Sequence, residues 1–277
     1  MSDPPAIECD SLVVRYGDLV AVDGASFRVQ QGELFGFLGP NGAGKTTTIA
    51  VLCTLRRATD GTVRVAGYDV HRRPRDVRGC IGVLFQDPSL DDRLTGRENL
   101  ELHAVVYRVP RSERRKRVAE AIDLTGLGAA IDRQTRTYSG GMKRRLELAR
   151  VLVHRPAVLF LDEPTAGLDP QTRRQIWGRL AEMRKQYGLT LFLTTHYMEE
   201  AEQADRVAIL DHGRIVAAGT PAELKASVPE EAVTHEPVPA GATLEDVFVH
   251  LTGHKIRDAN ADAKDVARTA LAKRGRL

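Results

Sequence analysis

Nine consecutive residues near the start of the chain have the composition of a phosphate-binding loop. Glycines hold the first and sixth positions, and a lysine and a threonine follow directly, so the segment satisfies G-x-x-x-x-G-K-[ST]. The glycines let backbone N–H groups face phosphate oxygens, the lysine reaches the β- and γ-phosphates, and the first threonine hydroxyl suits Mg²⁺. The pattern predicts a nucleotide phosphate site formed by Gly39, Pro40, Asn41, Gly42, Ala43, Gly44, Lys45, Thr46 and Thr47.

Two adjacent carboxylates far downstream suit the chemistry that such a loop supports. Four apolar residues, 158–161, carry a predicted strand into the core, and Asp162 and Glu163 follow at its carboxyl end. Ligands of open α/β sheets bind at that edge. Asp162 suits Mg²⁺ coordination, directly or through water, and Glu163 suits general-base activation or polarisation of an attacking water. The alternative, that both residues simply begin a turn before Pro164, does not account for the complete phosphate loop.

The elements that must position these residues alternate between strand and helix. Apolar runs without alternation are typical of buried parallel strands, so the chain is predicted to be an α/β protein with a mainly parallel sheet. The β-rich opening covers 7–16 and 20–29, and further strands are expected at 34–38, 62–68, 158–161, 189–194 and in a hairpin over 206–218. Helices are expected at 46–55, from Thr95, at 111–124, 142–153 and 170–187.

Composition divides the chain into a large domain and a short appendage. Residues 6–225 form the predicted domain, within which about 87–156 has a helical, charged composition. Residues 226–277 are predicted to hold a linker, one amphipathic helix and a basic tail. The helix rests on the helical spacing of four apolar residues and a capping threonine, namely Leu244, Val247, Phe248, Leu251 and Thr243.

Overall composition excludes several classes of protein. The formal charge is +3, too mild for a dedicated nucleic-acid binder, so no nucleic-acid partner is expected. Cys9, Cys53 and Cys80 lack metal-ligand spacing and are expected to be buried, reduced thiols. The first residues lack the pattern of a secretory signal, and apolar stretches are too short for a membrane-spanning helix. Any membrane component is therefore expected on a separate chain.

A second motif, Tyr138-Ser-Gly-Gly-Met-Lys143, completes a resemblance to a known family. From about residue 6 to 225 the chain resembles the ATP-binding subunits of ABC transporters, in motif order as well as content. The resemblance implies a P-loop NTPase core of the ABC ATPase type with a mainly parallel sheet. It also implies an N-terminal antiparallel β subdomain, a helical signature subdomain and a short C-terminal helical appendage.

The resemblance also assigns roles to single residues. Gln86 matches the glutamine that reports metal and γ-phosphate to the membrane partner, and it joins the predicted catalytic and metal-binding sets. His196 matches the switch histidine on the γ-phosphate, and Tyr16 matches the aromatic that stacks on adenine. Ser139, Gly140 and Gly141 match the signature that contacts the nucleotide of a partner subunit, and Asp169 belongs to the matching D-loop. Ser139 is also expected to cap a helix.

These roles imply a composite site shared by two subunits. Lys45, Mg²⁺, His196 and Ser139 of a second subunit would surround the γ-phosphate of ATP, because phosphoryl transfer needs charge neutralisation and positioning more than covalent chemistry. ATP would hold a homodimer or pseudo-dimer closed, and hydrolysis would loosen it.

Three functions remain open within the family: exporter ATPase, nutrient-importer ATPase and non-transport ATPase. Short segments such as Thr195-His-Tyr-Met-Glu-Glu-Ala-Glu202 and Thr243-Leu-Glu-Asp-Val-Phe248 are similar to those of the daunorubicin-resistance group of ABC-2 exporters. That resemblance implies efflux of a drug-like or lipophilic compound through a separate polytopic permease, with the chain peripheral on the cytoplasmic face of the membrane. The acidic residues Glu199, Glu200 and Glu202 also fit a solvated helix face.

Overall fold

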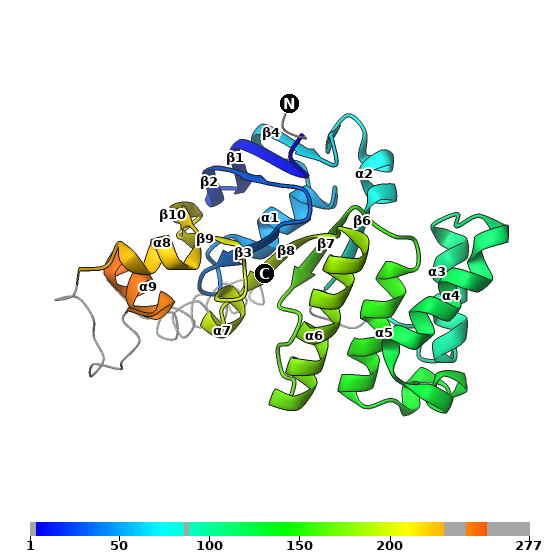
Figure 1. The fold of residues 1–277 in the computed structure, drawn as a ribbon. Helices are drawn as coiled ribbons and strands as arrows, with labels where there is room; N and C mark the ends of the chain where they lie inside the picture. Colours follow the sequence, from blue (N-terminus) through cyan, green and yellow to red (C-terminus); the bar gives the residue numbers. More distant parts are fainter. Residues whose placement is uncertain (1–3, 86–88, 230–241, 254–277) are drawn as a thin grey trace, which may run out of the picture.

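The computed structural model describes residues 4–85, 89–229 and 242–253 of the 277-residue chain. Two sheets and a group of helices make up this part of the molecule (Figure 1). The strands are β1 Ile7–Tyr16, β2 Leu19–Val29, β3 Leu34–Leu38, β4 Asp60–Val65, β5 Tyr68–Asp69, β6 Ile81–Leu84, β7 Val158–Asp162, β8 Thr190–Thr195, β9 Arg206–Asp211 and β10 Arg214–Gly219. The helices are α1 Lys45–Leu52, α2 Pro74–Cys80, α3 Gly96–Val106, α4 Arg111–Thr125, α5 Gly140–Leu152, α6 Pro170–Tyr187, α7 Met198–Ala201, α8 Pro221–Ala226 and α9 Leu244–Thr252, with short 3-10 turns at Gly128–Asp132 and Thr135–Thr137.

The six-stranded sheet confirms the predicted parallel core. Its order is β10-β9-β3-β8-β7-β6, and every pairing from β9 to β6 is parallel. Side chains alternate between its two faces: phenylalanines such as Phe35 and Phe192 join one buried cluster, whereas leucines such as Leu34 and Leu191 join another. Both faces are covered, which explains why these strands are continuously apolar.

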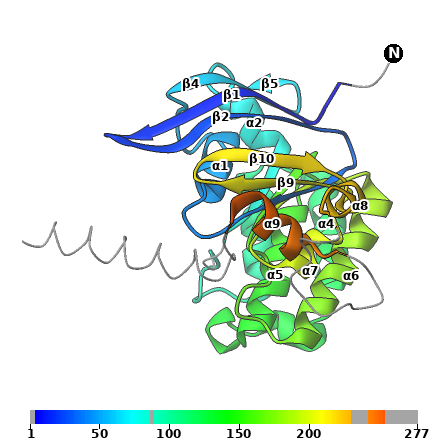
Figure 2. The ribbon, with the colours of Figure 1, turned by 90° about the vertical axis from the view of Figure 1, so that its left-hand side faces the viewer.

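The four-stranded sheet has the order β2-β1-β4-β5 and is antiparallel throughout, as the family resemblance implied. Figure 2 shows it lying over the strands of the six-stranded sheet, with α1 between the two. Phe27 of β2 stacks on Phe35 of β3, with ring centroids 5.7 Å apart, so one apolar cluster joins the two sheets.

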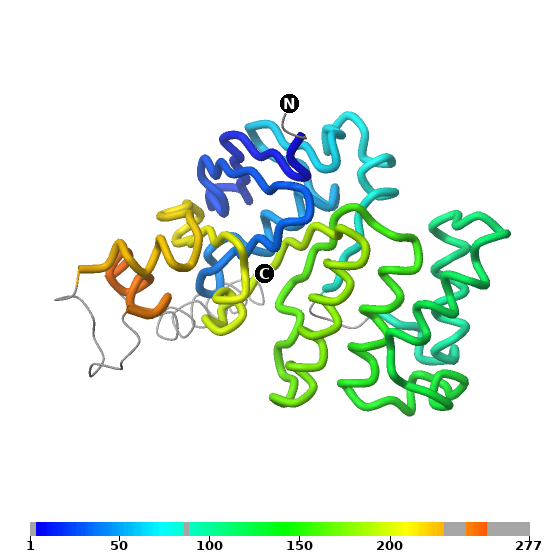
Figure 3. The backbone as a smooth tube through the Cα atoms, viewed as in Figure 1, coloured from blue at the N-terminus to red at the C-terminus, as the bar shows by residue number. Residues whose placement is uncertain are grey.

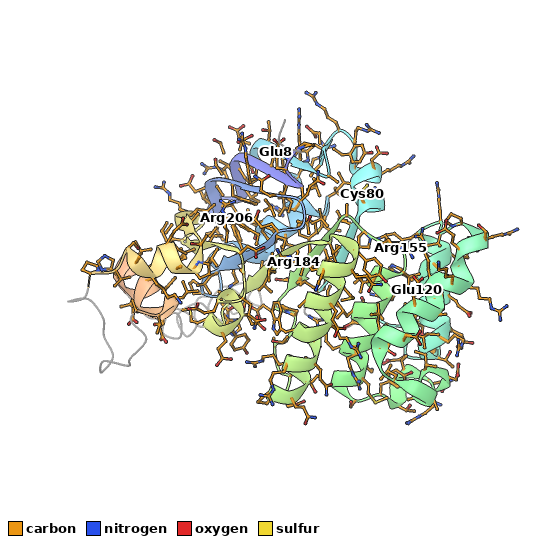
Figure 4. The ribbon with its side chains drawn as sticks, in the orientation of Figure 1. Glu8, Cys80, Glu120, Arg155, Arg184 and Arg206 are labelled. Atoms are coloured by element: carbon orange, nitrogen blue, oxygen red, sulfur yellow. The ribbon has the colours of Figure 1, made fainter. Side chains whose placement is uncertain are left out.

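Helices α3, α4 and α5 form a separate layer with its own core. The chain enters this layer after β6 and returns at β7, as the backbone trace shows (Figure 3). Leu100, Val118 and Leu146 pack within one cluster there. Thr95 begins α3 with a capping box to Glu98, as its sequence pattern predicts. Glu120 of α4 pairs with Arg155 at 3.0 Å, which ties the helical layer to the start of β7 (Figure 4).

Helix α9 packs on the opposite face of the six-stranded sheet from the phenylalanines. Leu244, Val247 and Phe248 are fully buried, and Thr243 caps the helix, both as predicted. Leu251 is the exception: it was expected on the apolar face, yet it is 39% exposed because α9 ends one residue later and packs only through its first two turns. The predicted linker core and the basic tail lie outside the described residues.

Other sequence predictions need small corrections. Helix α1 ends at Leu52 rather than residue 55, because Thr54 takes a left-handed conformation that breaks the helix. Cys9 and Cys53 are buried free thiols as expected, but Cys80 is only partly buried. Among the described residues, helices that are both long enough and apolar enough to cross a membrane are absent.

A pair of histidines joins α3 to the end of α5. His154 Nε2 lies 2.9 Å from the carbonyl oxygen of Ile81, so this nitrogen must carry the proton, and His154 Nδ1 then accepts from His103 Nε2 at 3.1 Å. The ring of Tyr107 stacks on both, with centroids 4.3 and 4.0 Å away. Burial, with the charges of His154 and Arg150, lowers the pKa of His103 to about 3, and burial also lowers the pKa of His154.

We expect this pair to make the fold acid-sensitive. Because the folded-state pKa of His103 lies below its ordinary value of 6.5, the unfolded chain binds more protons, and stability is lost as pH falls from 6.5 towards 3. Between pH 7 and pH 5, His103 should account for a loss of about 2 kcal/mol in the free energy of unfolding. His103→Gln, which keeps the donor but does not titrate, should remove that part of the loss in urea unfolding.

His250→Gln, on the exposed face of α9, is the matched control and should unfold with the wild-type pH dependence. An equal loss of stability in wild type and His103→Gln would contradict the assignment.

Candidate nucleotide site

The loop from Gly39 to Gly44 connects β3 to α1, whose first turn holds Lys45, Thr46 and Thr47, and two glycines of the loop are required by close contacts. Gly44 has φ of +105°, and a Cβ there would lie 2.5 Å from the carbonyl oxygen of Ala21. A Cβ on Gly39 would lie 2.4 Å from the carbonyl oxygen of Leu210. Both positions therefore exclude larger residues. The loop reaches its phosphate-binding shape by packing against β2 and β9, and α1 begins at its end.

Lys45 lies across the inside of this loop. Its Nζ donates to the carbonyl oxygens of Gly39 at 2.6 Å and Pro40 at 2.9 Å, and the residue is 5% exposed. Burial lowers the pKa of Lys45 to about 8, while the carboxylates of Glu163 and Asp162 act in the opposite direction. The ammonium is thus desolvated and held by neutral carbonyls, an arrangement that an incoming anionic phosphate would stabilise.

Asp162 ends β7 as predicted, and it is buried. Thr194 Oγ1, on the neighbouring strand β8, donates to its Oδ1 at 2.5 Å. Burial raises the pKa of Asp162, and the Thr194 bond, Lys45 and Thr46 oppose that shift. Carboxylate and hydroxyl oxygens are the donors that Mg²⁺ prefers, so Asp162 and Thr46 fit the metal expected from the sequence.

Glu163 and His196 face each other from the ends of β7 and β8. Glu163 Oε1 lies 3.0 Å from His196 Nδ1, and both side chains are mostly buried. The hydrogen bond from His196 is the main cause that lowers the pKa of Glu163, against the effect of burial. Glu163 also has φ of +46°, unusual for a residue with a side chain, and its N–H donates to the Thr194 carbonyl oxygen at 3.1 Å. A strained backbone and an ionised, histidine-bound carboxylate are features of a functional site.

Sequence reasoning missed a buried arginine that braces this site. Arg144, on α5, donates from Nη1 to the carbonyl oxygen of Phe85 and from Nε to that of Pro164, both at 2.6 Å. It also pairs with Glu147 at 3.4 Å, and Glu147 in turn accepts from the Ser89 N–H at 2.6 Å. The helix that follows the signature motif thus holds the two loops after β6 and β7. Its charged sequence gave no sign of which arginine would be buried.

The three acidic residues at α7 differ in their exposure. Glu199 is exposed and Glu202 partly exposed, in agreement with a solvated face, but Glu200 is 1% exposed. Its carboxyl accepts from the hydroxyls of Thr165 and Thr195. A solvated face, the alternative left open for all three residues, therefore does not hold for Glu200, because the helix turns this one side chain back towards β8.

The remaining predicted residues lie elsewhere on the surface. Ser139 and Gly140 are exposed where α5 begins, and Ser139 caps that helix as expected. Asp169 caps α6, accepting from the N–H groups of Gln171 and Thr172. Tyr16 is 45% exposed, and the guanidinium of Arg56 lies over one face of its ring, 3.4 Å from the centroid. Gln86 lies outside the described residues.

Comparison with known proteins identifies the family. The ABC transporter family matches residues 22–166. The chain is 50% identical over 224 residues to the daunorubicin/doxorubicin resistance ATP-binding protein DrrA of Streptomyces peucetius, covering 80% of this chain and 68% of that protein. It is 48% identical over 210 residues to the doxorubicin resistance ATP-binding protein DrrA of Mycobacterium tuberculosis, covering 76% of this chain and 63% of that protein. The chain therefore belongs to the ABC transporter family, as an ATP-binding subunit.

Solved structures show the same fold. An ATP-binding subunit of an ABC transporter superposes with a TM-score of 0.78 at 27% identity, covering 89% of this chain and 99% of that one. CbiO1 of Clostridium perfringens, part of the ABC transporter complex cbiONQ, superposes with a TM-score of 0.75 at 32% identity, covering 81% of this chain and 92% of that one. The fold is that of an ABC ATPase domain.

Arg144→Lys tests the bracing contacts. A lysine keeps the charge but has one nitrogen, so it leaves one of the two carbonyl oxygens at 2.6 Å without its donor. We expect the free energy of unfolding to fall by about 2 kcal/mol in urea or thermal unfolding. Arg115→Lys, an exposed arginine on α4, should change it by less than about 0.5 kcal/mol. Equal effects of the two substitutions would count against the bracing role.

Proposed function

We propose that this subunit hydrolyses MgATP in a closed dimer and thereby powers export of a drug-like or lipophilic compound through a separate membrane subunit. The observation that carries the proposal is the meeting of Lys45, Asp162, Glu163 and His196 where β3, β7 and β8 end. These are the residue types that phosphoryl transfer to water requires: a phosphate-binding cation, a metal ligand, a base and a polar group that holds the base.

Each of these residues has a distinct task in the proposal. Lys45 would leave its carbonyl partners for the β- and γ-phosphates, a change that keeps its ammonium charged. Thr46 and Asp162 would hold Mg²⁺, which neutralises phosphate charge when bound. Glu163, ionised and held by His196, is suited to polarise the attacking water or accept its proton. Gln86 retains the role implied by the resemblance, in which it reports metal and γ-phosphate to the membrane partner.

Dimerisation would complete the site from the outside. Ser139 and Gly140 are exposed at a helix start, where unsatisfied N–H groups favour anions, and we propose that they contact the nucleotide of a second molecule. Gly141 and Asp169 belong to the same proposed contact, and Tyr16 is proposed to stack on adenine with the ring face that the Arg56 guanidinium does not cover. Support comes from an ATP-binding cassette that was solved as a dimer bound to ADP and Pi, with a TM-score of 0.69 at 26% identity.

A surface groove supports a membrane partner. Arg75, Arg78 and Gly79 of α2 line it on one side, and Val106, Tyr107 and Arg108 at the end of α3 line it on the other, around a volume of about 510 Å³. Val106 is 65% exposed. We propose that a cytoplasmic segment of the permease enters this groove. The chain would then be peripheral on the cytoplasmic face of the membrane.

Export rather than import is favoured by the relatives. Several relatives at 44–50% identity are named daunorubicin or doxorubicin resistance proteins, and another, from Paraburkholderia xenovorans at 45% identity, is named a Nod factor export ATP-binding protein. The names of these relatives support the proposal of a drug-like compound as the cargo. The alternatives are an importer ATPase and a non-transport ATPase, and identification of the binding partner would distinguish them from an exporter.

Glu163→Gln tests the catalytic assignment. The amide has the size of the carboxylate but cannot accept a proton, so ATP turnover should fall by about 100-fold or more. ATP binding should persist, and light scattering should show a dimer that forms with ATP. Glu199→Gln, on the exposed side of α7, should hydrolyse ATP like wild type. Near wild-type hydrolysis by Glu163→Gln would refute the role of Glu163.

Affinity capture from native membranes tests the exporter assignment. Tagged Glu163→Gln protein with ATP should retain a polytopic membrane protein. The double substitution Arg75→Glu and Arg108→Glu should lose that protein while still binding ATP, because both charges line the groove. Arg174→Glu, exposed on α6, is the control. Recovery of soluble partners alone would favour a non-transport ATPase.

A further inference from the structure

The carboxyl group of Glu200 is buried between the two loops that carry Glu163 and His196. Thr195 Oγ1 donates to its Oε2 at 2.5 Å, and Thr165 Oγ1 donates to its Oε1. Glu200 is 1% exposed, and both threonines are fully buried. Each carboxyl oxygen thus holds one loop: Thr165 lies in the turn after β7, and Thr195 is the last residue of β8.

Stability alone gives no reason for a carboxyl group at this position. Burying a carboxylate costs free energy that hydrogen bonds and nearby cations only partly offset. The nearby cation is Arg144, whose guanidinium also donates to the Pro164 carbonyl oxygen and interacts electrostatically with Glu200. An apolar side chain would pack at this place at a lower cost, but it would join neither loop.

The two threonines lie very close to the reacting pair. Thr195 directly precedes His196, and its carbonyl oxygen accepts from the N–H of Gly39, the first residue of the phosphate loop, at 3.4 Å. Thr165 lies two residues after Glu163, whose carbonyl oxygen closes the turn by accepting from the N–H of Ala166 at 3.2 Å. A shift of either threonine would therefore move Glu163 or His196.

We propose that Glu200 is a positioning residue that keeps Glu163 and His196 in register across the ends of β7 and β8. This inference rests on the proposed function of those two residues. Glu200 does not reach the reacting atoms. Its two hydrogen bonds fix the backbone on both sides of the 3.0 Å contact between His196 Nδ1 and Glu163 Oε1.

Substitution of Glu200 separates positioning from bulk packing. Glu200→Ala removes both contacts and should lower kcat for ATP hydrolysis by about 10- to 100-fold, with little change in ATP affinity. Glu200→Gln has an acceptor and a donor, so rotation of the threonine hydroxyls can restore both contacts, and kcat should lie within about fivefold of wild type. Glu199→Ala is the matched control on the same helix and should hydrolyse ATP like wild type.

A double-mutant cycle with His196→Ala distinguishes positioning from a general loss of folding. If Glu200 acts through the Glu163–His196 pair, Glu200→Ala should cost less than about threefold once His196 is absent. The inference is wrong if the two losses multiply, or if both Glu200 variants hydrolyse ATP within twofold of wild type while Glu163→Gln is inactive. Hydrolysis by Glu163→Gln at the wild-type rate would instead refute the proposed function of Glu163.

A readout that does not depend on hydrolysis accompanies the kinetics. The ¹⁵N resonance of His196 Nδ1, assigned with His196→Gln, should report the hydrogen bond to Glu163. It should shift in Glu200→Ala and return towards the wild-type position in Glu200→Gln. An unchanged resonance in folded Glu200→Ala would overturn the inference whatever the rate of hydrolysis.

Discussion

The parallel pairing of β3, β8 and β7 is the constraint on which the site depends. Leu38 pairs with Thr195, and Asp162 pairs with Thr194, so the three strands end at one level. Parallel strands direct their carboxyl ends to a single edge, and segments more than a hundred residues apart in the sequence meet there. A slip of one residue in this register would turn Asp162 away from Thr194 and would carry the carboxylates proposed for the site to the wrong face.

Polar groups at this edge are buried, and each is matched by a specific partner. The ammonium of Lys45 binds two carbonyl oxygens, Asp162 binds Thr194, Glu163 binds His196, and Arg144 binds carbonyl oxygens on both neighbouring loops. Each partner offsets a desolvation cost, so the loss of one leaves another charge unsatisfied. The groups of this site consequently hold one another in place, and the exchange proposed for Lys45, from carbonyl oxygens to phosphate oxygens, keeps its ammonium paired.

Much of this arrangement was predictable from the sequence, for a physical reason. An apolar run followed by Gly39 or by Asp162 predicts both the strand and the residue at which it ends. The parallel core and the phosphate loop therefore follow from local sequence patterns. Side chains that act across loops carry no such pattern. Glu200 has the same sequence setting as its exposed neighbour Glu199, and Arg144 the same as Arg145. Only the three-dimensional packing of α5 and α7 determines which member of each pair is buried.

Helix α9 lies beyond the proposed end of the ATPase domain in the sequence, yet its apolar side chains are part of that domain's hydrophobic core. Leu244, Val247 and Phe248 belong to the same apolar cluster as Leu34 of β3 and Ile209 of β9. A chain shortened to residue 226 would therefore expose an apolar patch on the sheet face next to α7, the helix that follows His196. For anyone who produces this ATPase in isolation, the natural place to cut lies after α9.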